Sequence, residues 1–171
     1  MGGGVVVRIG HMPTGQRQWS TATMVVADYF GIPMENVRVV YLDSLSQPPG
    51  FGPGGSRCGV AMTGGILGAC GLLKEKLIKV AAHLLKAPRE AVELMDGMLR
   101  IKATPQAAIP MPQVVATMLC RSDLLPPDVD MNPTATYAWT AEGRLPPDNM
   151  GRCKSYLTAA NACHVVQVEL D

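Results

Sequence analysis

The sequence predicts an α+β domain in which helices pack against a mixed β-sheet. Two strand patterns near the N-terminus flank a helical segment, and a second, much longer helical segment follows them. Further along, the pair Asp96-Gly97 stands between two short apolar runs, which is typical of a β-hairpin. The chain has 171 residues, of which 47% are hydrophobic and 17% charged, so it is long and apolar enough to form a buried core.

The first predicted elements are a strand, a helix and a strand. Apolar residues alternate over residues 5–9, which predicts the first strand. Ser20 or Thr21 is a suitable N-cap for the helix, and Gly31 predicts a left-handed stop at its end. Residues 37–42 predict the second strand.

A long helix is predicted over residues 57–85, directly after a segment rich in glycine and proline. Its first half contains Gly59, Gly64, Gly65, Gly68 and Gly71. Each interior glycine costs about 1 kcal/mol of helix stability relative to alanine. So many glycines therefore predict that another element packs closely against this part of the helix.

The second half of the chain predicts shorter elements. Residues 92–94 and 98–101 form the strands of the hairpin, and Pro112 opens a short helix that extends to about Leu119. Residues 121–151 are rich in proline and polar residues and predict a long loop or linker within one partial domain that spans residues 1–171. Residues 162–170 predict a final strand.

Charge and hydropathy exclude several classes of partner. The formal net charge of +1 indicates neither a nucleic-acid nor a membrane-surface partner. No apolar run approaches the roughly 20 residues that span a bilayer. The first residues lack the pattern of a signal peptide, so we expect a cytoplasmic protein.

The cysteines do not form a metal-binding pattern. There are five of them and no CxxC pair, which leaves an iron–sulfur or zinc-ribbon site without the usual spacing. Cys153 with the pair Cys163-His164 is an alternative half zinc site, but reduced thiols of an intracellular protein are the simpler interpretation.

Two glycine-containing loops stand before the two predicted long helices. The candidate binding residues are Gly15, Gln16, Arg17 and Gln18 in the first loop, and Gly55, Ser56, Arg57 and Cys58 in the second. A helix start exposes unpaired N–H groups and the positive end of the dipole, which favours an anion such as a phosphate. Such loops are also common without any ligand, and neither the Walker nor the dinucleotide-binding motif is present.

Four successive blocks of sequence carry a resemblance to one enzyme family. They are Gly15-Gln16 before a helix, Val26-Ala27-Asp28 followed by Phe30-Gly31-Ile32-Pro33, Glu35-Asn36-Val37-Arg38-Val39, and Gly55-Ser56-Arg57. Their order and spacing resemble the xanthine dehydrogenase / aldehyde oxidase / aerobic carbon monoxide dehydrogenase family. The similar part of that family is the second molybdopterin-binding domain of the large, molybdenum-containing subunit.

The resemblance implies a subunit or fragment of a multi-subunit molybdenum hydroxylase, an oxidoreductase. Its cofactor would be molybdenum bound to molybdopterin, in the cytosine dinucleotide form, with iron–sulfur clusters and FAD on partner subunits. Such enzymes hydroxylate an N-heterocycle or an aldehyde, or oxidise carbon monoxide. By matched position, the residues from Gly15 to Gln18 would approach the pterin or the ligands of the metal. Those from Gly55 to Cys58 would line the pterin or its phosphate.

Two departures from the family pattern limit what the resemblance implies. Arg17 stands where the family has glycine, so it is a strained residue, a cation for a phosphate or an acidic substrate, or a solvent-facing side chain in a relaxed loop. No glutamate of this chain matches the family's general base, so we assign no catalytic residue. We therefore expect other molybdenum-subunit chains to complete the active site and this chain to be inactive alone. A non-catalytic module for cofactor storage or delivery, or a structural module, is the alternative.

Overall fold

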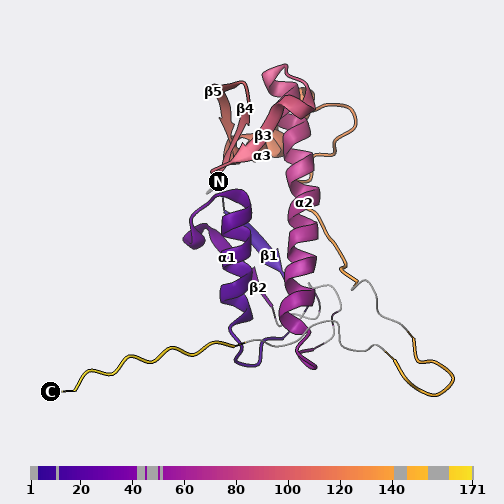
Figure 1. The fold of residues 1–171 in the computed structure, drawn as a ribbon. Coiled ribbons are helices and arrows are strands. Elements are labelled where there is room, and N and C mark those ends of the chain that lie inside the picture. The colour runs from indigo at the N-terminus through magenta and orange to yellow at the C-terminus, as the bar shows by residue number, and fades with distance from the viewer. Residues whose placement is uncertain are drawn as a thin grey trace.

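A single long helix organises the fold in the computed structural model, which describes residues 4–10, 12–41, 45, 50, 52–140, 146–153 and 162–170. The elements are β1 (Val5–Arg8), α1 (Gln18–Phe30), η1 (Met34–Asn36), β2 (Val37–Val40), α2 (Cys58–Leu85), η2 (Arg89–Ala91), β3 (Val92–Met95), β4 (Met98–Ile101), β5 (Thr104–Pro110), α3 (Met111–Cys120) and η3 (Ser122–Leu124). In Figure 1, α1, β1 and β2 lie beside the N-terminal half of α2, while β3, β4, β5 and α3 surround its C-terminal half. The predicted α+β class is confirmed, but the described strands form two separate sheets, one parallel and one antiparallel, in place of the single mixed sheet that the sequence predicts.

The N-terminal group is a strand–helix–strand unit. β1 and β2 pair in parallel, with Val5 opposite Val37 and Val7 opposite Val39. The helix α1 connects them and buries Val26 completely against the core that it shares with α2. Because a parallel pair needs a crossover connection, the strand–helix–strand order along the chain favours this arrangement.

The start of α1 lies earlier than the sequence predicts. Neither Ser20 nor Thr21 is the N-cap, so that prediction is wrong. Arg17 has a left-handed conformation with φ 54°, and its carbonyl accepts the N–H groups of both residues. The backbone therefore turns into the helix at Gln18, without a side-chain cap.

The end of α1 is confirmed at Gly31, which has φ 62°. A Cβ atom at this glycine would lie 2.5 Å from the Cα atom of Asp96. The N–H of Gly97 also donates to the carbonyl of Phe30 at 2.9 Å. The end of α1 thus packs directly against the turn of the hairpin, which no local sequence signal predicts.

The hairpin of β3 and β4 is confirmed, and β5 extends it to a three-stranded antiparallel sheet. Asp96 and Gly97 have φ 51° and 69°, the positive values that a tight two-residue hairpin turn requires. The sequence does not predict β5, because this segment contains two prolines and no alternating apolar pattern. β5 is an edge strand, where proline is tolerated. Its extended conformation therefore depends on the hydrogen bonds with β4, because the local sequence does not favour a strand.

The core lies between the C-terminal half of α2, the three-stranded sheet and α3. The predicted short helix is confirmed as α3, which begins one residue earlier, at Met111. The largest fully buried side chains are Phe30, Leu77, Leu99, Met118, Val26, Val80 and Val114. They come from α1, α2, α3 and β4, so one apolar core joins both groups of elements.

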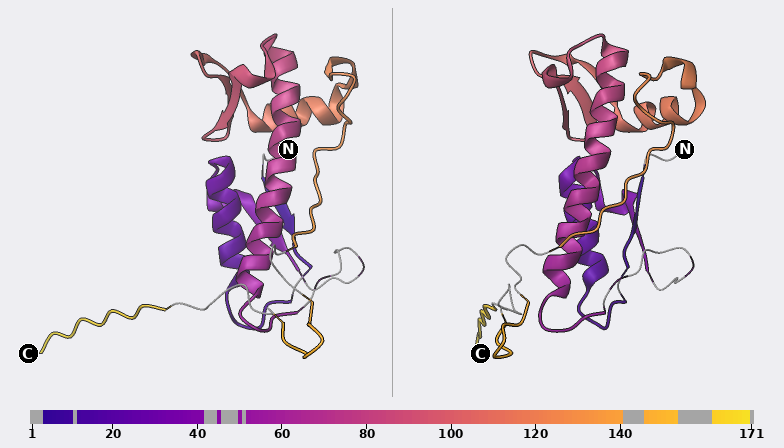
Figure 2. Two further views of the ribbon diagram at one scale, coloured as in Figure 1. Left: turned by 45° about the vertical axis from the view of Figure 1, so that its right-hand side comes forward. Right: turned by 90° about the vertical axis from the view of Figure 1, so that its right-hand side faces the viewer.

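Residues 134–140, here called the strap, run along α2 outside any helix or strand (Figure 2). A Cβ atom at Gly64 would lie 2.6 Å from the indole of Trp139, and one at Gly68 would lie 2.2 Å from the ring of Tyr137. The predicted close packing against this half of α2 is therefore confirmed. Two aromatic rings of the strap occupy the space that side chains at these two positions would fill.

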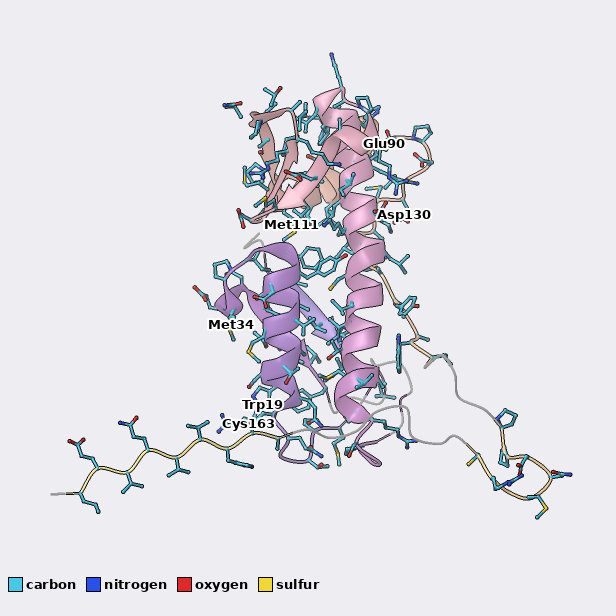
Figure 3. All side chains as sticks on the ribbon, in the orientation of Figure 1. Trp19, Met34, Glu90, Met111, Asp130 and Cys163 are labelled. Carbon is cyan, nitrogen blue, oxygen red and sulfur yellow. The ribbon has the colours of Figure 1, made fainter. Side chains whose placement is uncertain are left out.

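Lys76 anchors the segment just before the strap. Its ammonium donates to the carboxylate of Asp130 at 2.9 Å and to the carbonyl of Asn132 at 3.0 Å. The hydrogen bond from Lys76 holds the pKa of Asp130 below its ordinary value. Figure 3 shows Asp130 beside α2.

Residues 162–170 do not form the predicted strand. They are exposed and pair with none of the described strands (Figure 1). An alternating apolar pattern favours an extended chain, but a strand also needs a neighbour for its N–H and C=O groups.

None of the helices in the described residues combines the length and the hydropathy that a membrane span requires.

Candidate functional site

The two loops predicted from the sequence meet at one cavity of about 440 Å³. Its lining residues are Thr14, Gln16, Gln18, Thr21, Pro53, Gly54, Ser56, Cys58, Gly59 and Met62. They come from the loop before α1, the loop before α2 and the first turns of both helices. Cavities of this size hold small molecules and cofactors in other proteins.

Gln18 connects the two loops. It lies at the start of α1 and is only 5% exposed. Its Nε2 donates to Sγ of Cys58 at 3.3 Å, across 40 residues of sequence, and to Oε1 of Gln16 at 3.1 Å. The side chain of Gln18 therefore fixes the first loop against the start of α2.

Gln16 is fixed by the same network. Its Oε1 also accepts the backbone N–H of Thr14 at 2.9 Å and the hydroxyl of Thr14 at 2.8 Å. With the bond from Gln18, three donors converge on this one oxygen. The exposed loop thus presents the carboxamide of Gln16 to the cavity in a defined orientation.

The other oxygen of the network has no partner. Oε1 of Gln18 is the one buried side-chain nitrogen or oxygen in the described residues that makes no hydrogen bond. Leaving a buried acceptor unpaired costs about 1–3 kcal/mol. Since Gln18 lines the cavity, a ligand with an N–H donor would satisfy this atom.

The backbone makes the same cavity suitable for an anion. Both α1 and α2 begin at it, and neither helix has an acidic residue in its first turn. The first N–H groups of a helix have no acceptor within the helix, and the dipole adds a partial positive charge there. Gly55 and Ser56 both have positive φ, 59° and 54°, before Arg57 returns to right-handed geometry. When left-handed residues are followed by a right-handed one, the N–H groups of neighbouring residues point toward the same side and can bind one anion.

Half of the predicted site residues line this cavity. Gln16, Gln18, Ser56 and Cys58 do so. Gly15, Arg17, Gly55 and Arg57 do not, and they shape the turns beside it instead. That all eight contact a cofactor stays a prediction.

Six further lining residues were not among the predicted site residues, namely Thr14, Thr21, Pro53, Gly54, Gly59 and Met62. Helical spacing would have found two of them. Thr21 follows Gln18 by three positions, and Met62 follows Cys58 by four, so each lies one turn above a predicted residue on the same face.

Arg17 is exposed and left-handed, with φ 54° and ψ 35°. The strain anticipated for an arginine at a glycine position is therefore present. Left-handed backbone costs a non-glycine residue roughly 1–2 kcal/mol. The backbone of Arg17 is therefore strained and not relaxed, while its side chain faces solvent, and its role as a cation for a phosphate or an acidic substrate stays a prediction.

The remaining candidates carry no site in the described part of the chain. No three histidine, cysteine, aspartate or glutamate side chains lie close enough there to hold a metal ion. The apolar sequence around His83 predicts that this histidine packs in the core; that prediction is wrong, because His83 is exposed on α2. Cys153 and Cys163 are exposed and form no disulfide within the described residues. His11, which stands near the first loop in the sequence, lies outside the described residues.

Comparison with known proteins identifies the family. The family model described as "Molybdopterin cofactor-binding domain" matches residues 1–171. The chain belongs to this family. The resemblance to the molybdenum hydroxylases found in the sequence is thereby confirmed at the family level.

Individual relatives agree with this assignment. The chain is 28% identical to the nicotine 6-hydroxylase large subunit of Paenarthrobacter nicotinovorans, over 99% of this chain and 19% of that protein. It is 32% identical to the carbon monoxide dehydrogenase large chain of Hydrogenophaga pseudoflava, over 58% of this chain and 12% of that protein. The chain therefore spans about a fifth or less of these relatives.

A solved structure confirms the fold. Quinoline 2-oxidoreductase from Pseudomonas putida 86 superposes with a TM-score of 0.71 and 28% identity, over 79% of this chain and 17% of that chain. The residues around the cavity fit a molybdopterin. The pterin ring of a molybdopterin carries N–H donors, which would satisfy the unpartnered oxygen of Gln18, and its side chain ends in a phosphate, which the two helix starts favour.

Proposed function

We propose that this chain forms one wall of the molybdopterin site in a multi-subunit molybdenum-dependent oxidoreductase. The observation that carries the proposal is the buried, unpartnered Oε1 of Gln18 at a cavity where two helices begin. The family match and the large-subunit relatives support it. In this proposal the 171 residues act as one partial domain, with residues 121–151 as a loop within it.

Each part of the cavity has a separate task. Gln18 accepts an N–H group of the pterin while its own Nε2 keeps Gln16 and Cys58 in place. The starts of α1 and α2 and the hydroxyl of Ser56 bind the phosphate end. When bound, the molybdenum cofactor supplies the redox chemistry. The residues of this chain bind and orient it.

The described lining of the cavity contains no carboxylate or histidine that could act as a general base on the substrate. We therefore propose that other molybdenum-subunit segments supply the general base and that iron–sulfur and flavin subunits carry the electrons away. The relatives include a nicotine hydroxylase and a carbon monoxide dehydrogenase, which supports hydroxylation of an N-heterocycle or aldehyde, or oxidation of carbon monoxide.

Two finer features belong to the same proposal. The cofactor takes the cytosine dinucleotide form, which nucleotide analysis of the extracted cofactor tests. The protein is cytoplasmic, which the absence of disulfides among its described cysteines supports, since reduced cysteines are typical of reducing compartments. Cell fractionation tests this location.

The cofactor content of purified variants tests the assignment of the loops. We expect Gln16→Ala and Ser56→Ala each to lower the molybdenum and pterin content of the assembled protein severalfold, with little change in unfolding. Gln113→Ala, an exposed glutamine on α3, is the matched control and keeps wild-type content. Wild-type content in both loop variants would refute the assignment. A chain that holds pterin without partner subunits would instead indicate a storage module.

A further inference from the structure

Cys58 differs from Cys70, the other buried cysteine of the same helix. Both have little exposed surface, 8% for Cys58 and 6% for Cys70. Cys70 belongs to the apolar core, where burial raises the pKa of its thiol from 9.0 to about 11. Cys58 instead lines the polar cavity, and its Sγ accepts a hydrogen bond from Nε2 of Gln18 at 3.3 Å. One thiol is therefore buried in the core, while the other faces the cavity.

The position of Cys58 suits a thiol that reacts. Cys58 is the first residue of α2, where the N–H groups have no acceptor within the helix and the dipole adds a partial positive charge. These groups stabilise the negative charge that sulfur carries when it attacks, and reactive cysteines are often found at helix starts. The cavity of about 440 Å³ gives a small molecule access to the side chain.

A second observation indicates what kind of molecule suits this thiol. The carboxamide of Gln18 that donates to Sγ also carries the buried Oε1, which makes no hydrogen bond within the described residues. A molecule bonded to Sγ would lie within reach of this acceptor and needs an N–H donor for it. The two helix starts at the cavity favour a negative charge on the same molecule. A small peptide thiol with amide N–H groups and carboxylates, such as glutathione, has both features.

We propose that Cys58 is a modification site, at which the cofactor-free protein forms a mixed disulfide with a small anionic peptide thiol. The inference rests on the proposed function and deepens it, because the bound peptide would occupy the space of the cofactor and regulate its loading. Mixed disulfides of this kind are reversible, and disulfides in reducing compartments are usually transient and redox-sensing.

The reaction is a thiol–disulfide exchange with the oxidised, disulfide-linked form of the peptide. The Cys58 thiolate attacks one sulfur of this disulfide, so that a new S–S bond forms at Cys58 and the S–S bond of the peptide dimer breaks. The second peptide leaves as a thiolate and takes up the proton that Cys58 lost. Cys58 is oxidised and one peptide thiol is reduced, so the exchange needs no further oxidant. An excess of the reduced peptide reverses it.

Peptide mass spectrometry of the 171-residue chain after incubation with glutathione disulfide tests the proposal. We expect Cys58 to gain glutathione at least about tenfold faster than Cys70, the matched buried control on the same helix. Gln18→Leu removes both the donor to Sγ and the unpartnered acceptor, and it should slow the modification of Cys58 severalfold relative to the exposed Cys120. Gln113→Ala should leave this ratio unchanged. Modification of Cys70 in a variant would reveal unfolding.

The assembled protein tests the link to the cofactor. With the molybdenum cofactor bound, Cys58 should be protected from glutathione disulfide, whereas the same assembly after removal of the cofactor should be modified. The modified assembly should load less cofactor until a thiol reductant is added. Cys58→Ser should make the loading insensitive to prior treatment with the disulfide.

The proposal is overturned if Cys58 reacts no faster than Cys70, or if Gln18→Leu leaves its rate unchanged. These results differ from failure of the proposed function. If Cys58 is modified as expected but bound cofactor gives no protection, and Gln16→Ala and Ser56→Ala keep wild-type molybdenum content, the modification site stands and the cofactor assignment fails. If both loop variants lower the molybdenum content while Cys58 stays unmodified, the cofactor assignment stands and the modification site fails.

Discussion

The two halves of α2 differ in what they contribute to the protein. In the C-terminal half, Leu77 and Val80 are 1% and 0% exposed and pack against the three-stranded sheet and α3. The N-terminal half contains five glycines and begins at the polar cavity. The C-terminal half stabilises the fold, while the N-terminal half is a less stable helix whose backbone two aromatic rings approach and which begins at the cavity that we propose binds the cofactor.

The buried half of α2 stabilises the glycine-rich half of the same helix. An isolated helix with this many glycines would be unstable, because each costs about 1 kcal/mol. The buried C-terminal half and the partner helix α1 stabilise the whole element. The glycine-rich half is thereby free to present a surface near the cavity, and substitutions in the two halves should have different consequences.

The largest expected effect is a loss of stability from Leu77→Ala. The side chain is fully buried, so its removal leaves a cavity and costs about 2–5 kcal/mol of the free energy of unfolding. Urea denaturation measures this cost. Leu67→Ala in the N-terminal half of the same helix is the control, since Leu67 is 43% exposed and its loss should cost less than about 0.5 kcal/mol. Equal effects would show that the C-terminal half is not the stabilising half.

A methyl group at two glycines of the other half should act in opposite directions. Gly68→Ala places its Cβ 2.2 Å from the Tyr137 ring, so it overpacks the contact and costs about 1–3 kcal/mol, or displaces the strap. Limited proteolysis within residues 134–140 detects the displacement. Gly59→Ala meets no described atom outside its own helix and, because Gly59 is only the second residue of α2, should raise stability by less than the roughly 0.5–1 kcal/mol expected for a glycine in the middle of a helix. If both variants behave alike, the distinction between packed and open glycines is incorrect.

A smaller effect is expected at the strained residue before α1. Arg17→Gly should raise the free energy of unfolding by about 1 kcal/mol, because glycine adopts φ 54° without strain. Arg57→Gly is the matched control, since Arg57 is right-handed with φ −94°, so glycine relieves no strain there and should lower the free energy of unfolding by about 0.4–1 kcal/mol through the added freedom of the unfolded chain. A large fall in cofactor content for Arg17→Gly would indicate instead that its charge binds the ligand.

The smallest expected effect is a pH dependence at high pH. Burial raises the pKa of the Cys70 thiol from 9.0 to about 11. Below pH 9 the thiol is protonated in both states, so its contribution to stability is complete. Between about pH 9 and 11 the unfolded state loses this proton first, and stability declines. Denaturation curves at several pH values measure the decline, and Cys70→Ala should reduce it. Tyr29, whose pKa burial also raises, accounts for a remaining slope.

Local signals in the sequence were sufficient to predict several turns, the end of α1 and the two loops before the helices. The positive φ values of Gly31, Asp96 and Gly97 follow from residue type and turn chemistry, and the structure has them where they were expected. The two glycine-containing loops before the helices were also recognised, because glycine next to polar side chains at a helix start is a local pattern. The order of four sequence blocks then indicated the family, which the family model confirms.

Only the tertiary structure decided how distant segments meet. The contact of Gln18 with Cys58, the unpartnered oxygen beside it and the rings of the strap on Gly64 and Gly68 join residues far apart in the chain. The strand β5 arises from pairing with β4, while residues 162–170 have the strand pattern and no described partner. Residue type sets local backbone preferences, but pairing and burial depend on the neighbours that the fold supplies. For that reason the sequence was enough to predict the two loops and the family, whereas the cavity between the two loops is a result of the tertiary structure.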